Sequence, residues 1–311
     1  MNKTLLDIVI INWNSGDLLQ DCVSSIRTSS IALPGELIVV DNGEKEQKVD
    51  DLAQQYGCKL LRPETNLGFG GGCNLGASAG KADHILFLNP DIILFPDTLA
   101  NLTALLSSDT LATDVGIIGV QLIGRDGKIQ QNVARFPRCS HLYARMLYLD
   151  HLFPGIFPPH FIRNMDYQRT QIVDQVPGAF FLMKRSAFNE LHGFDERFFM
   201  YYEDVDISYR ALQKGWKTLY LCEVSVLHAG GGATESIQGK RLFYLLRSRA
   251  LYVRKHFGWL NATLVALATI SLEFAARLLR AVLRVSPREI WAALSAYTLF
   301  LISIPAIVRK P

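Results

Sequence analysis

The chain has 311 residues, 49% of them hydrophobic and 20% charged, so a disordered chain is excluded, and ordinary glycine and proline contents exclude collagen-like and low-complexity classes. The formal net charge of +3 conceals an asymmetry, because residues 240–311 carry 12 Lys and Arg against 2 Asp and Glu, a balance of +10, while the preceding residues have a balance of −7. A basic tail on an acidic body indicates contact with a membrane or a nucleic acid, and the long apolar runs between its charges argue against a nucleic acid.

Strand and helix signals alternate along the first part of the chain. The predicted strands cover residues 8–11, 36–41, 59–62 and 84–88, and the predicted helices cover residues 15–27, 45–56 and 73–79. This alternation predicts an α/β fold with a mostly parallel sheet flanked by helices. Ligands of such sheets bind beyond the carboxyl ends of the strands, where this chain carries Asn12, Asp41 and Asn89.

A glycine-rich segment, residues 68–76, lies between a predicted strand and a predicted helix. Its spacing does not fit the dinucleotide-binding pattern G-x-G-x-x-G, because the third glycine would fall on Cys73 or on Leu75. A nicotinamide-dependent oxidoreductase is therefore disfavoured. The glycines would still let backbone N–H groups approach a phosphate or ribose at a helix N-terminus. The alternative is a flexible turn that binds no ligand.

Two acidic segments are candidates for chemistry. Asp91 follows a strand and could hold a divalent cation, although many strands end in an aspartate that serves only a turn. Residues 203–206 follow an aromatic run at a predicted helix start. Partial burial there would raise the pKa of Asp204 and make it a better proton acceptor near neutral pH. For Asp206 we expect a structural ion pair with Arg210, one helical turn away.

His228 closes the apolar run of residues 219–227 and precedes several glycines, which is a suitable place for a metal ligand, whereas a lone histidine is more often structural. Residues 136–170 show little periodicity and predict a long excursion. Residues 240–256 form a predicted basic helix, either a solvated amphipathic face or a surface that meets lipid phosphates. Its basic residues include Arg241, Arg247, Arg249, Arg254 and Lys255.

The tail contains two apolar stretches, residues 259–283 and 290–308, with basic residues on both sides of the second. The second stretch is 19 residues long and uncharged, about the minimum for a membrane-spanning helix. Positive charge at both of its ends argues against a single span. Two interpretations remain: an interfacial or re-entrant hairpin on anionic lipid, or a bundle that covers the rest of the chain or a dimer interface.

The motifs that belong together are, in chain order, Ile8–Asn14, Val39–Gly43, Asn66–Gly76, Phe87–Asp91, Pro177–Phe180, Gly193–Glu196, Glu203–Asp206 and His228. This series resembles the family 2 glycosyltransferases with the GT-A fold, and most closely their rhamnosyltransferase-like branch. The resemblance covers roughly residues 5–260. It implies an inverting transfer from a nucleotide-activated sugar.

The resemblance also implies roles for single residues. Asp204 matches the catalytic base, with Glu203 beside it. Asp91 and His228 would hold Mg²⁺ or Mn²⁺, in a variant of the family's DxD element whose first acid is replaced by Asn89. The implied nucleotide-binding residues are Asn12, Trp13, Asp41, Gly68, Gly70, Gly71, Asn74 and Asn89. Asp195 would face the acceptor. Apart from the resemblance, Arg247 of the basic helix is expected to meet the phosphates of a lipid-linked acceptor, if that helix is not merely a solvated face.

The function that follows is transfer of L-rhamnose from dTDP-rhamnose to a lipid-linked or polysaccharide acceptor, in cell-surface glycan synthesis at the cytoplasmic face of the membrane. One alternative keeps the fold and uses a UDP-sugar donor, and another is a non-catalytic sugar-nucleotide-binding scaffold protein. Residues 1–258 would form the catalytic domain, and residues 259–311 a membrane-associating helical hairpin. Expected partners are the donor, the acceptor, a membrane surface and a second copy in a homodimer, with no nucleic acid.

Overall fold

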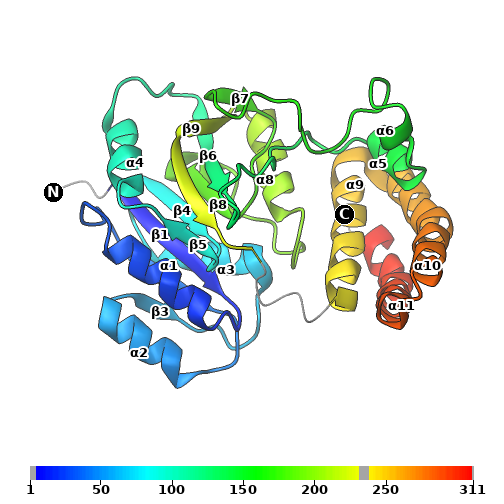
Figure 1. The fold of residues 1–311 in the computed structure, drawn as a ribbon, viewed down its shortest axis with the longest axis horizontal. Helices are drawn as coiled ribbons and strands as arrows, with labels where there is room; N and C mark the ends of the chain where they lie inside the picture. Colours follow the sequence, from blue (N-terminus) through cyan, green and yellow to red (C-terminus); the bar gives the residue numbers. More distant parts are fainter. Residues whose placement is uncertain (1–4, 231–237, 310–311) are drawn as a thin grey trace. The chain divides into compact units, whose positions relative to one another are not determined.

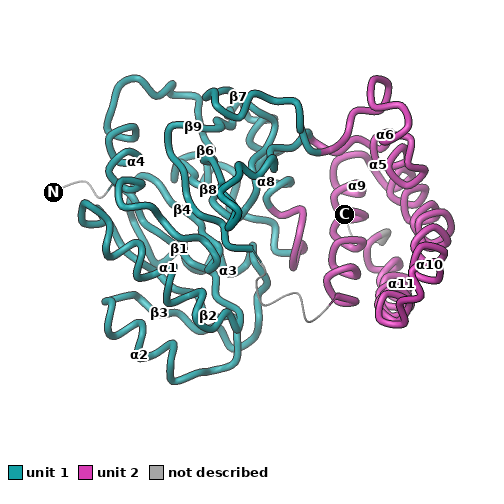
Figure 2. The backbone as a smooth tube through the Cα atoms, in the orientation of Figure 1, with its two compact units in different colours: residues 1–135, 161–196, 204–233 teal, residues 136–160, 197–203, 234–311 magenta. Residues whose placement is uncertain are grey.

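The computed structural model describes residues 5–230 and 238–309 of the chain. It divides into two compact units, which Figure 2 shows in different colours. The first unit contains residues 1–135, 161–196 and 204–233, and the second contains residues 136–160, 197–203 and 234–311. The expected domain boundary after residue 258 lies inside the second unit, at Gly258, where a φ of 87° breaks the helical conformation.

A nine-stranded sheet forms the centre of the first unit (Figure 1). Its strands are β1 (Leu6–Asn12), β2 (Leu37–Asp41), β3 (Lys59–Leu61), β4 (His84–Leu88), β5 (Ile92–Leu94), β6 (Val115–Ile123), β7 (Gln171–Val173), β8 (Phe180–Lys184) and β9 (Lys217–His228). They lie in the order β3-β2-β1-β4-β8-β6-β9-β5, and β7 pairs with β9. Strands β1 to β4 are parallel, as expected, whereas β8 runs antiparallel to both β4 and β6. The sheet is therefore parallel on one side of β4 and mixed on the other.

Helices cover both faces of this sheet. In the first unit they are α1 (Asp17–Arg27), α2 (Gln47–Tyr56), α3 (Gly68–Ala79), α4 (Thr98–Ser107), α7 (Arg185–Glu190) and α8 (Glu203–Gln213), which begins one residue before the unit resumes. Neighbouring strand residues point to opposite faces. Ile8 and Ile10 pack with α1, α2 and α4, whereas Val9 and Ile11 pack with α3, α7 and α8. Because both faces are buried, the strands are apolar throughout, as parallel strands usually are.

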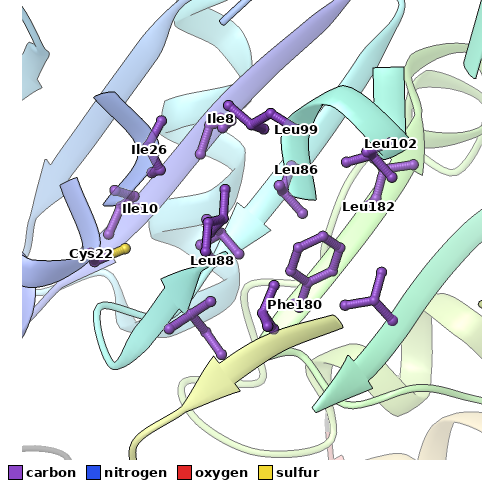
Figure 3. Close-up of a cluster of buried hydrophobic side chains, with 14 of the residues drawn as sticks. Ile8, Ile10, Cys22, Ile26, Leu86, Leu88, Leu99, Leu102, Phe180 and Leu182 are labelled. Atoms are coloured by element: carbon purple, nitrogen blue, oxygen red, sulfur yellow. The ribbon is translucent and has the colours of Figure 1, made fainter. Parts of the chain in front are cut away.

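The first of these two cores is drawn in Figure 3, which shows Ile8, Ile10, Leu86 and Leu88 of the parallel strands between helices α1 and α4. Phe180 and Leu182 of β8 continue the same layer, so the antiparallel strand joins the core without a break. The sheet and its two helical layers confirm the α/β class that the sequence predicts.

Asp7 is an acid inside the otherwise apolar strand β1, and it is 1% exposed. Its carboxylate accepts hydrogen bonds from the backbone N–H groups of Glu36 at 2.9 Å and Ala82 at 2.7 Å. Arg185 also donates to it at 2.8 Å. A buried charge is tolerated when it is paired and hydrogen-bonded, so Asp7 links β1 to the first residue of α7 and to the segments that precede β2 and β4.

The glycine-rich segment differs from its expected form. The sequence predicts a turn followed by a helix from Cys73, but α3 already begins at Gly68, so that the glycines occupy its first turns. Their lack of a side chain lets the helix lie close to the sheet. A Cβ atom at Gly76 would be 2.2 Å from Cγ1 of Val9, and one at Gly72 would be 3.1 Å from Cγ2 of Ile11.

The second unit is helical. Its helices are α5 (Cys139–Met146), α6 (Leu149–Leu152), α9 (Gln238–Ala268), α10 (Phe274–Leu283) and α11 (Pro287–Arg309), with a π-helical turn, η2 (Thr269–Glu273), between α9 and α10. The predicted excursion over residues 136–170 thus contains two short helices. Leu246, Ala296, Tyr297 and Phe300 are among the residues of the unit's own buried core. The two expected C-terminal apolar helical segments are confirmed.

Arg249 of α9 corrects the expectation that it belongs to a surface that is either solvated or in contact with lipid phosphates. It is 8% exposed, and its Nη2 lies 2.5 Å from Glu273 and 2.8 Å from the hydroxyl of Thr269. Glu273 also accepts a hydrogen bond from Arg277 at 2.9 Å. The guanidinium is therefore part of an internal ion-pair network, and reversing its charge would leave Glu273 with only one of its two cationic partners.

Candidate active site

The carboxyl ends of β1 and β2 place Asn12 beside Asp41, which are partners in the parallel register. Asn12 Nδ2 donates to Asp41 Oδ1 at 2.8 Å, and Arg62 Nε donates to Asp41 Oδ2 at 3.0 Å. Both carboxylate oxygens are thus already engaged. Asn12 Oδ1 is buried and has no hydrogen-bond partner among the described residues, so it is the open acceptor of this pair. The half-buried Trp13 follows directly.

The N-terminus of α3 is held by Asn42, which directly follows β2. Asn42 Nδ2 donates to the carbonyl of Gly68 at 2.8 Å, and its Oδ1 accepts the N–H of Leu67 at 3.4 Å. Gly68 has a φ of 73°, which favours glycine. Gly68, Gly70 and Gly71 are all buried in the first turns of this helix. The end of β2 therefore positions the glycine segment.

Asn74 uses its side chain within the protein. Its Nδ2 donates to the carbonyl of Phe194 at 2.9 Å and to Glu196 at 3.0 Å, and its Oδ1 accepts the N–H of Phe194 at 2.8 Å. A Cβ atom at Gly193 would lie 2.5 Å from this Oδ1, so only glycine fits there. Asn74 thus fixes the segment that carries the half-buried Asp195. Its predicted contact with the nucleotide stays a prediction.

Asp91 and His228 are brought together by the antiparallel pairing of β5 with β9, in which Ile92 faces His228. Asp91 Oδ2 lies 3.4 Å from His228 Nε2, and the backbone N–H of Ala229 donates to the carbonyl of Asp91 at 2.9 Å. Asp91 Oδ1 is buried and has no hydrogen-bond partner among the described residues. This carboxylate therefore retains a free oxygen beside an imidazole.

Gln130 fixes the orientation of the His228 ring. Its Nε2 donates to the His228 carbonyl at 3.3 Å, which turns its Oε1 toward His228 Nδ1 at 2.7 Å. With the proton of a neutral ring on Nδ1, the lone pair of Nε2 points at the Asp91 carboxylate. Two acceptors face each other in this way only when a cation or a proton lies between them, so the pair fits a divalent metal.

Two protein ligands alone would not complete such a site. Within residues 5–230 and 238–307, no group of three or more His, Cys, Asp and Glu side chains is arranged to hold a metal ion. Asp91 and His228 would therefore supply part of the coordination sphere, and the diphosphate oxygens of a bound nucleotide together with water would supply the rest, as is common for Mg²⁺.

Asp204 lies in the first turn of α8 and is half-buried. Its Oδ2 accepts the backbone N–H of Gly178 at 3.0 Å, and its Oδ1 accepts that of Val205 at 2.8 Å. Burial raises the pKa of this carboxyl group, and the backbone hydrogen bonds oppose the rise only in part. A Cβ atom at Gly178 would be 3.5 Å from both Asp204 and the Phe69 ring, so this base candidate lies close to the start of α3.

The neighbouring acids have separate roles. Asp206 is fully buried, and Arg210 Nε donates to it at 2.8 Å, which confirms the expected structural ion pair. Arg210 also donates to the carbonyls of Leu191 and Gly193 at 2.7 and 2.9 Å. Glu203, the first residue of α8, is 7% exposed.

The metal-ligand pair and the base candidate are connected by the pairing of β4 with β8. The backbone N–H of Asn89 donates to the carbonyl of Ala179 at 3.0 Å, next to Gly178, whose N–H is bound by Asp204. Asp91 is two residues beyond Asn89. The fold thus assembles the Asn89–Asp91 segment, His228 and Asp204 at one edge, although these residues are far apart in the sequence.

Arg247 belongs to the second unit. Its Nη1 donates to the backbone carbonyl of Arg197 at 2.8 Å, and burial lowers the pKa of its guanidinium. Four further residues position the site: Asn42, Arg62, Gln130 and Gly178. Two of them had a signal in the sequence, because Asn42 follows Asp41 at a strand end and Gly178 lies in the Pro177–Phe180 motif. Arg62 and Gln130 depend on contacts between distant segments, which no local sequence pattern indicates.

Comparison with known proteins relates this geometry to a family. A family model described as glycosyl transferase family 2 matches residues 7–192, more than half of the chain. The match includes the ends of β1, β2 and β4, the glycine helix and Asp91. It ends before Asp204 and His228, so the roles of these two residues rest on the geometry and on the resemblance of their motifs.

Curated relatives extend the likeness over most of the chain. The N-acetylglucosaminyl-diphospho-decaprenol L-rhamnosyltransferase of Mycobacterium tuberculosis is 28% identical, over 84% of this chain and 88% of its own. Rhamnosyltransferase WbbL of Escherichia coli K12 is 27% identical, over 80% of this chain and 92% of its own. The solved structure of mannosyltransferase PcManGT from Pyrobaculum calidifontis, in complex with GDP-Man and Mn²⁺, has a TM-score of 0.54 at 14% identity, over 97% of this chain and 87% of its own. At this low sequence identity, the structural similarity supports the shared fold alone.

Proposed function

The chain belongs to glycosyl transferase family 2 and has the GT-A fold, and we propose that it transfers L-rhamnose from dTDP-rhamnose to a lipid-linked acceptor in cell-surface glycan synthesis. The observation that carries this proposal is that two relatives named as rhamnosyltransferases align with most of this chain and most of their own. The name of the mycobacterial relative includes N-acetylglucosaminyl-diphospho-decaprenol. A sugar on a polyprenyl diphosphate is accordingly the acceptor class that we propose.

The proposed reaction is a single inverting displacement with Asp204 as the general base. The acceptor hydroxyl oxygen forms a bond to the anomeric carbon, its proton passes to Asp204, and the bond from that carbon to the diphosphate breaks, which releases a nucleoside diphosphate. The raised pKa of Asp204 suits this role, because a general base is most effective when its pKa lies near the working pH. Asp195, held by the Asn74 clamp, is proposed to face the acceptor.

The fit of Asp91 and His228 to a cation supports a metal-dependent reaction, as does the Mn²⁺ in the PcManGT complex. Asp91 would bind Mg²⁺ or Mn²⁺ through its free Oδ1, and His228 would bind it through Nε2 with Gln130 holding the ring. When bound there, such a cation neutralises negative charge on the leaving diphosphate. Asp91 and His228 would act by holding that cation at the diphosphate end of the donor.

The nucleotide end of the donor is proposed to lie at the ends of β1 and β2. Asn12 Oδ1 would accept an N–H of the base, and Asp41, fixed by Asn12 and Arg62, would line the same pocket with Trp13. The buried glycines at the start of α3 would leave room for the ribose and the diphosphate. Asn89 would border the same diphosphate next to Asp91.

The C-terminal helices are proposed to hold the enzyme at the cytoplasmic face of the membrane, with residues 1–258 as the catalytic domain and 259–311 as the attaching hairpin. Two described helical stretches, Gln238–Leu283 and Pro287–Ile307, are long and apolar enough to cross a membrane. Only 28% of the most apolar part of each stretch is buried, which is low for the core helix of a globular domain. Arg247, with one guanidinium nitrogen bound to Arg197, would meet the phosphates of the acceptor with its other N–H groups.

A donor screen with the purified full chain tests the proposed function. The enzyme is given an N-acetylglucosaminyl-diphospho-polyprenol with dTDP-rhamnose, UDP-sugars or GDP-mannose, with Mg²⁺, with Mn²⁺ or with a chelator, and nucleoside diphosphate release is measured. We expect dTDP-rhamnose to be the best donor and the chelator to stop the reaction. A UDP-sugar as the best donor would replace the proposed substrate, and binding without turnover of any donor would indicate a scaffold protein.

The variant Asp204→Asn tests the base in the same screen. We expect turnover to fall by about 10²- to 10⁴-fold, the usual contribution of a positioned base, while dTDP affinity measured by calorimetry is unchanged. Wild-type turnover in this variant would reject Asp204 as the base.

A further inference from the structure

Residues 197–202 lead to Glu203 and Asp204 at the start of α8, and the last two residues of this segment have a strained backbone. Tyr201 and Tyr202 are consecutive residues with φ values of 66° and 68°. This left-handed region suits glycine, and a bulky residue in it is strained and persists only where its surroundings impose it. Helix α8 begins at Glu203, so this strained pair lies directly before the helical turn that carries Asp204.

Helix α9 provides the contacts that impose this conformation. Arg241 Nε donates to the hydroxyl of Tyr201 at 3.0 Å, and Ser248 Oγ donates to the carbonyl of Met200 at 2.8 Å. The second hydrogen bond is shielded from water, because Ser248 is 1% exposed. The hydrogen bond from Arg247 to Arg197 holds the beginning of the same segment.

Aromatic packing continues this series of contacts along the helix. The ring of Tyr244 stacks on that of Phe199 with centroids 4.7 Å apart, and the ring of Tyr252 lies 5.4 Å from that of Tyr202. Residues three, four or seven positions apart lie along one face of a helix, which accounts for the spacing of the contacting residues. They are Arg241, Tyr244, Ser248 and Tyr252.

The boundary between the two units falls directly before Asp204. Residues 197–203 and α9 belong to the second unit, and residue 204 begins a stretch of the first. The peptide bond between Glu203 and Asp204 therefore joins the segment that α9 fixes to the residue proposed as the base. Along the chain, only Glu203 lies between Tyr202, which α9 contacts, and Asp204.

We propose that Arg241 and Ser248 are positioning residues for the transfer reaction, holding residues 197–202 so that Asp204 stands at its working position. The proposal rests on the proposed function, since it requires Asp204 to be the base. Misplacing a catalytic group by about 1 Å can lower the rate about 10²-fold. The residues proposed to bind the donor lie at β1, β2 and α3, outside the segment that α9 holds in this way. Loss of either hydrogen bond should therefore lower kcat and leave the KM for the donor unchanged.

The experiment compares Arg241→Met, Arg241→Lys and Ser248→Ala with Lys240→Met, an exposed matched control one residue away on α9. Hydrogen–deuterium exchange is measured for peptides covering residues 197–206 and 84–91, together with kcat, the donor KM and the melting temperature. We expect Arg241→Met and Ser248→Ala to raise exchange only in residues 197–206 and to lower kcat by about tenfold or more. Arg241→Lys should recover part of kcat because it keeps a donor for Tyr201, and Lys240→Met should match the wild type.

Three outcomes would overturn the proposal. Unchanged exchange in residues 197–206 would show that α9 does not hold the segment. Raised exchange with wild-type kcat, while Asp204→Asn is inactive, would show that the segment does not position the base. A rise in donor KM together with a lower melting temperature would indicate a general structural role. The proposed function fails separately, when the wild type turns over no donor or Asp204→Asn remains active, and the positioning role then fails with it.

Discussion

At the scale of single residues, Asp204 experiences two opposing effects on its pKa. Burial raises it, and this is the larger effect, while the N–H groups of Gly178 and Val205 stabilise the carboxylate and lower it. The balance leaves a stronger base than an exposed aspartate, held in a fixed direction by two backbone hydrogen bonds. Such a group is suited to accept a proton from a sugar hydroxyl near neutral pH.

The pH dependence of the reaction should report this raised pKa. Only the ionised form of Asp204 accepts a proton, so kcat/KM should fall as the pH is lowered through its pKa. Because burial raises that pKa, the fall should begin above the range of an ordinary aspartate, about pH 3.9. A profile of kcat/KM against pH measures it, with circular dichroism at each pH to verify folding. A plateau that extends down to the ordinary aspartate range would contradict the prediction.

Much of the candidate site could be predicted at this scale, but not the partners of its residues. The positions of Asn12, Asp41 and Asn89 at strand ends follow from hydrophobic patterning and are found as expected. That Arg62 binds Asp41 depends on the pairing of β2 with β3, and that Gln130 orients His228 depends on contacts 98 residues apart in the sequence. Local patterns contain no information on such long-range contacts.

At the scale of elements, α3 is where local propensity and structure disagree. Glycine in a helix interior costs roughly 1 kcal/mol per residue relative to alanine, so residues 68–72 predict a turn. Packing overrides this cost, since α3 lies so close to β1 that a side chain at Gly76 would meet Val9 and Val40. Short elements such as β5 and β7 were likewise not predicted, because three residues give too little periodicity and both depend on β9 as a partner.

The variant Gly76→Ala tests this packing. Alanine is the better helix former, but its Cβ would lie 2.2 Å from Cγ1 of the fully buried Val9. Overpacking of this kind costs about 1–3 kcal/mol, so we expect a lower free energy of unfolding in urea denaturation despite the gain in helix propensity. Ser78→Ala, at an exposed position on the same helix, is the control and should stay close to the wild type. A stabilised Gly76→Ala protein would mean that α3 can move away from the sheet at little cost.

At the scale of the whole molecule, the near-neutral net charge divides into an acidic body and a basic tail with different surfaces. The C-terminal part of the chain, from Trp259 to the end of α11, exposes large apolar side chains that a water-soluble surface rarely shows together. They include Trp259 at 60%, Leu283 at 74%, Val285 at 84%, Trp291 at 72% and Ile302 at 71% exposure. Exposed basic residues, Arg280 among them, occur in the same helices, while Arg249 is neutralised internally by Glu273. Apolar side chains with basic neighbours are complementary to an anionic lipid interface.

Vesicle binding should therefore depend on these apolar side chains. Removing one large apolar side chain from a lipid contact forfeits about 1.5–3 kcal/mol, so Leu283→Ser and Trp291→Ser should each weaken partition onto anionic vesicles by about tenfold or more. Cosedimentation with phosphatidylglycerol vesicles measures the partition, and the melting temperature verifies that the variants fold. Leu212→Ser in α8, where the side chain is 51% exposed, is the matched control and should bind like the wild type. If both variants instead bind vesicles normally and lose a dimer on size-exclusion chromatography, the helices cover a subunit interface rather than lipid.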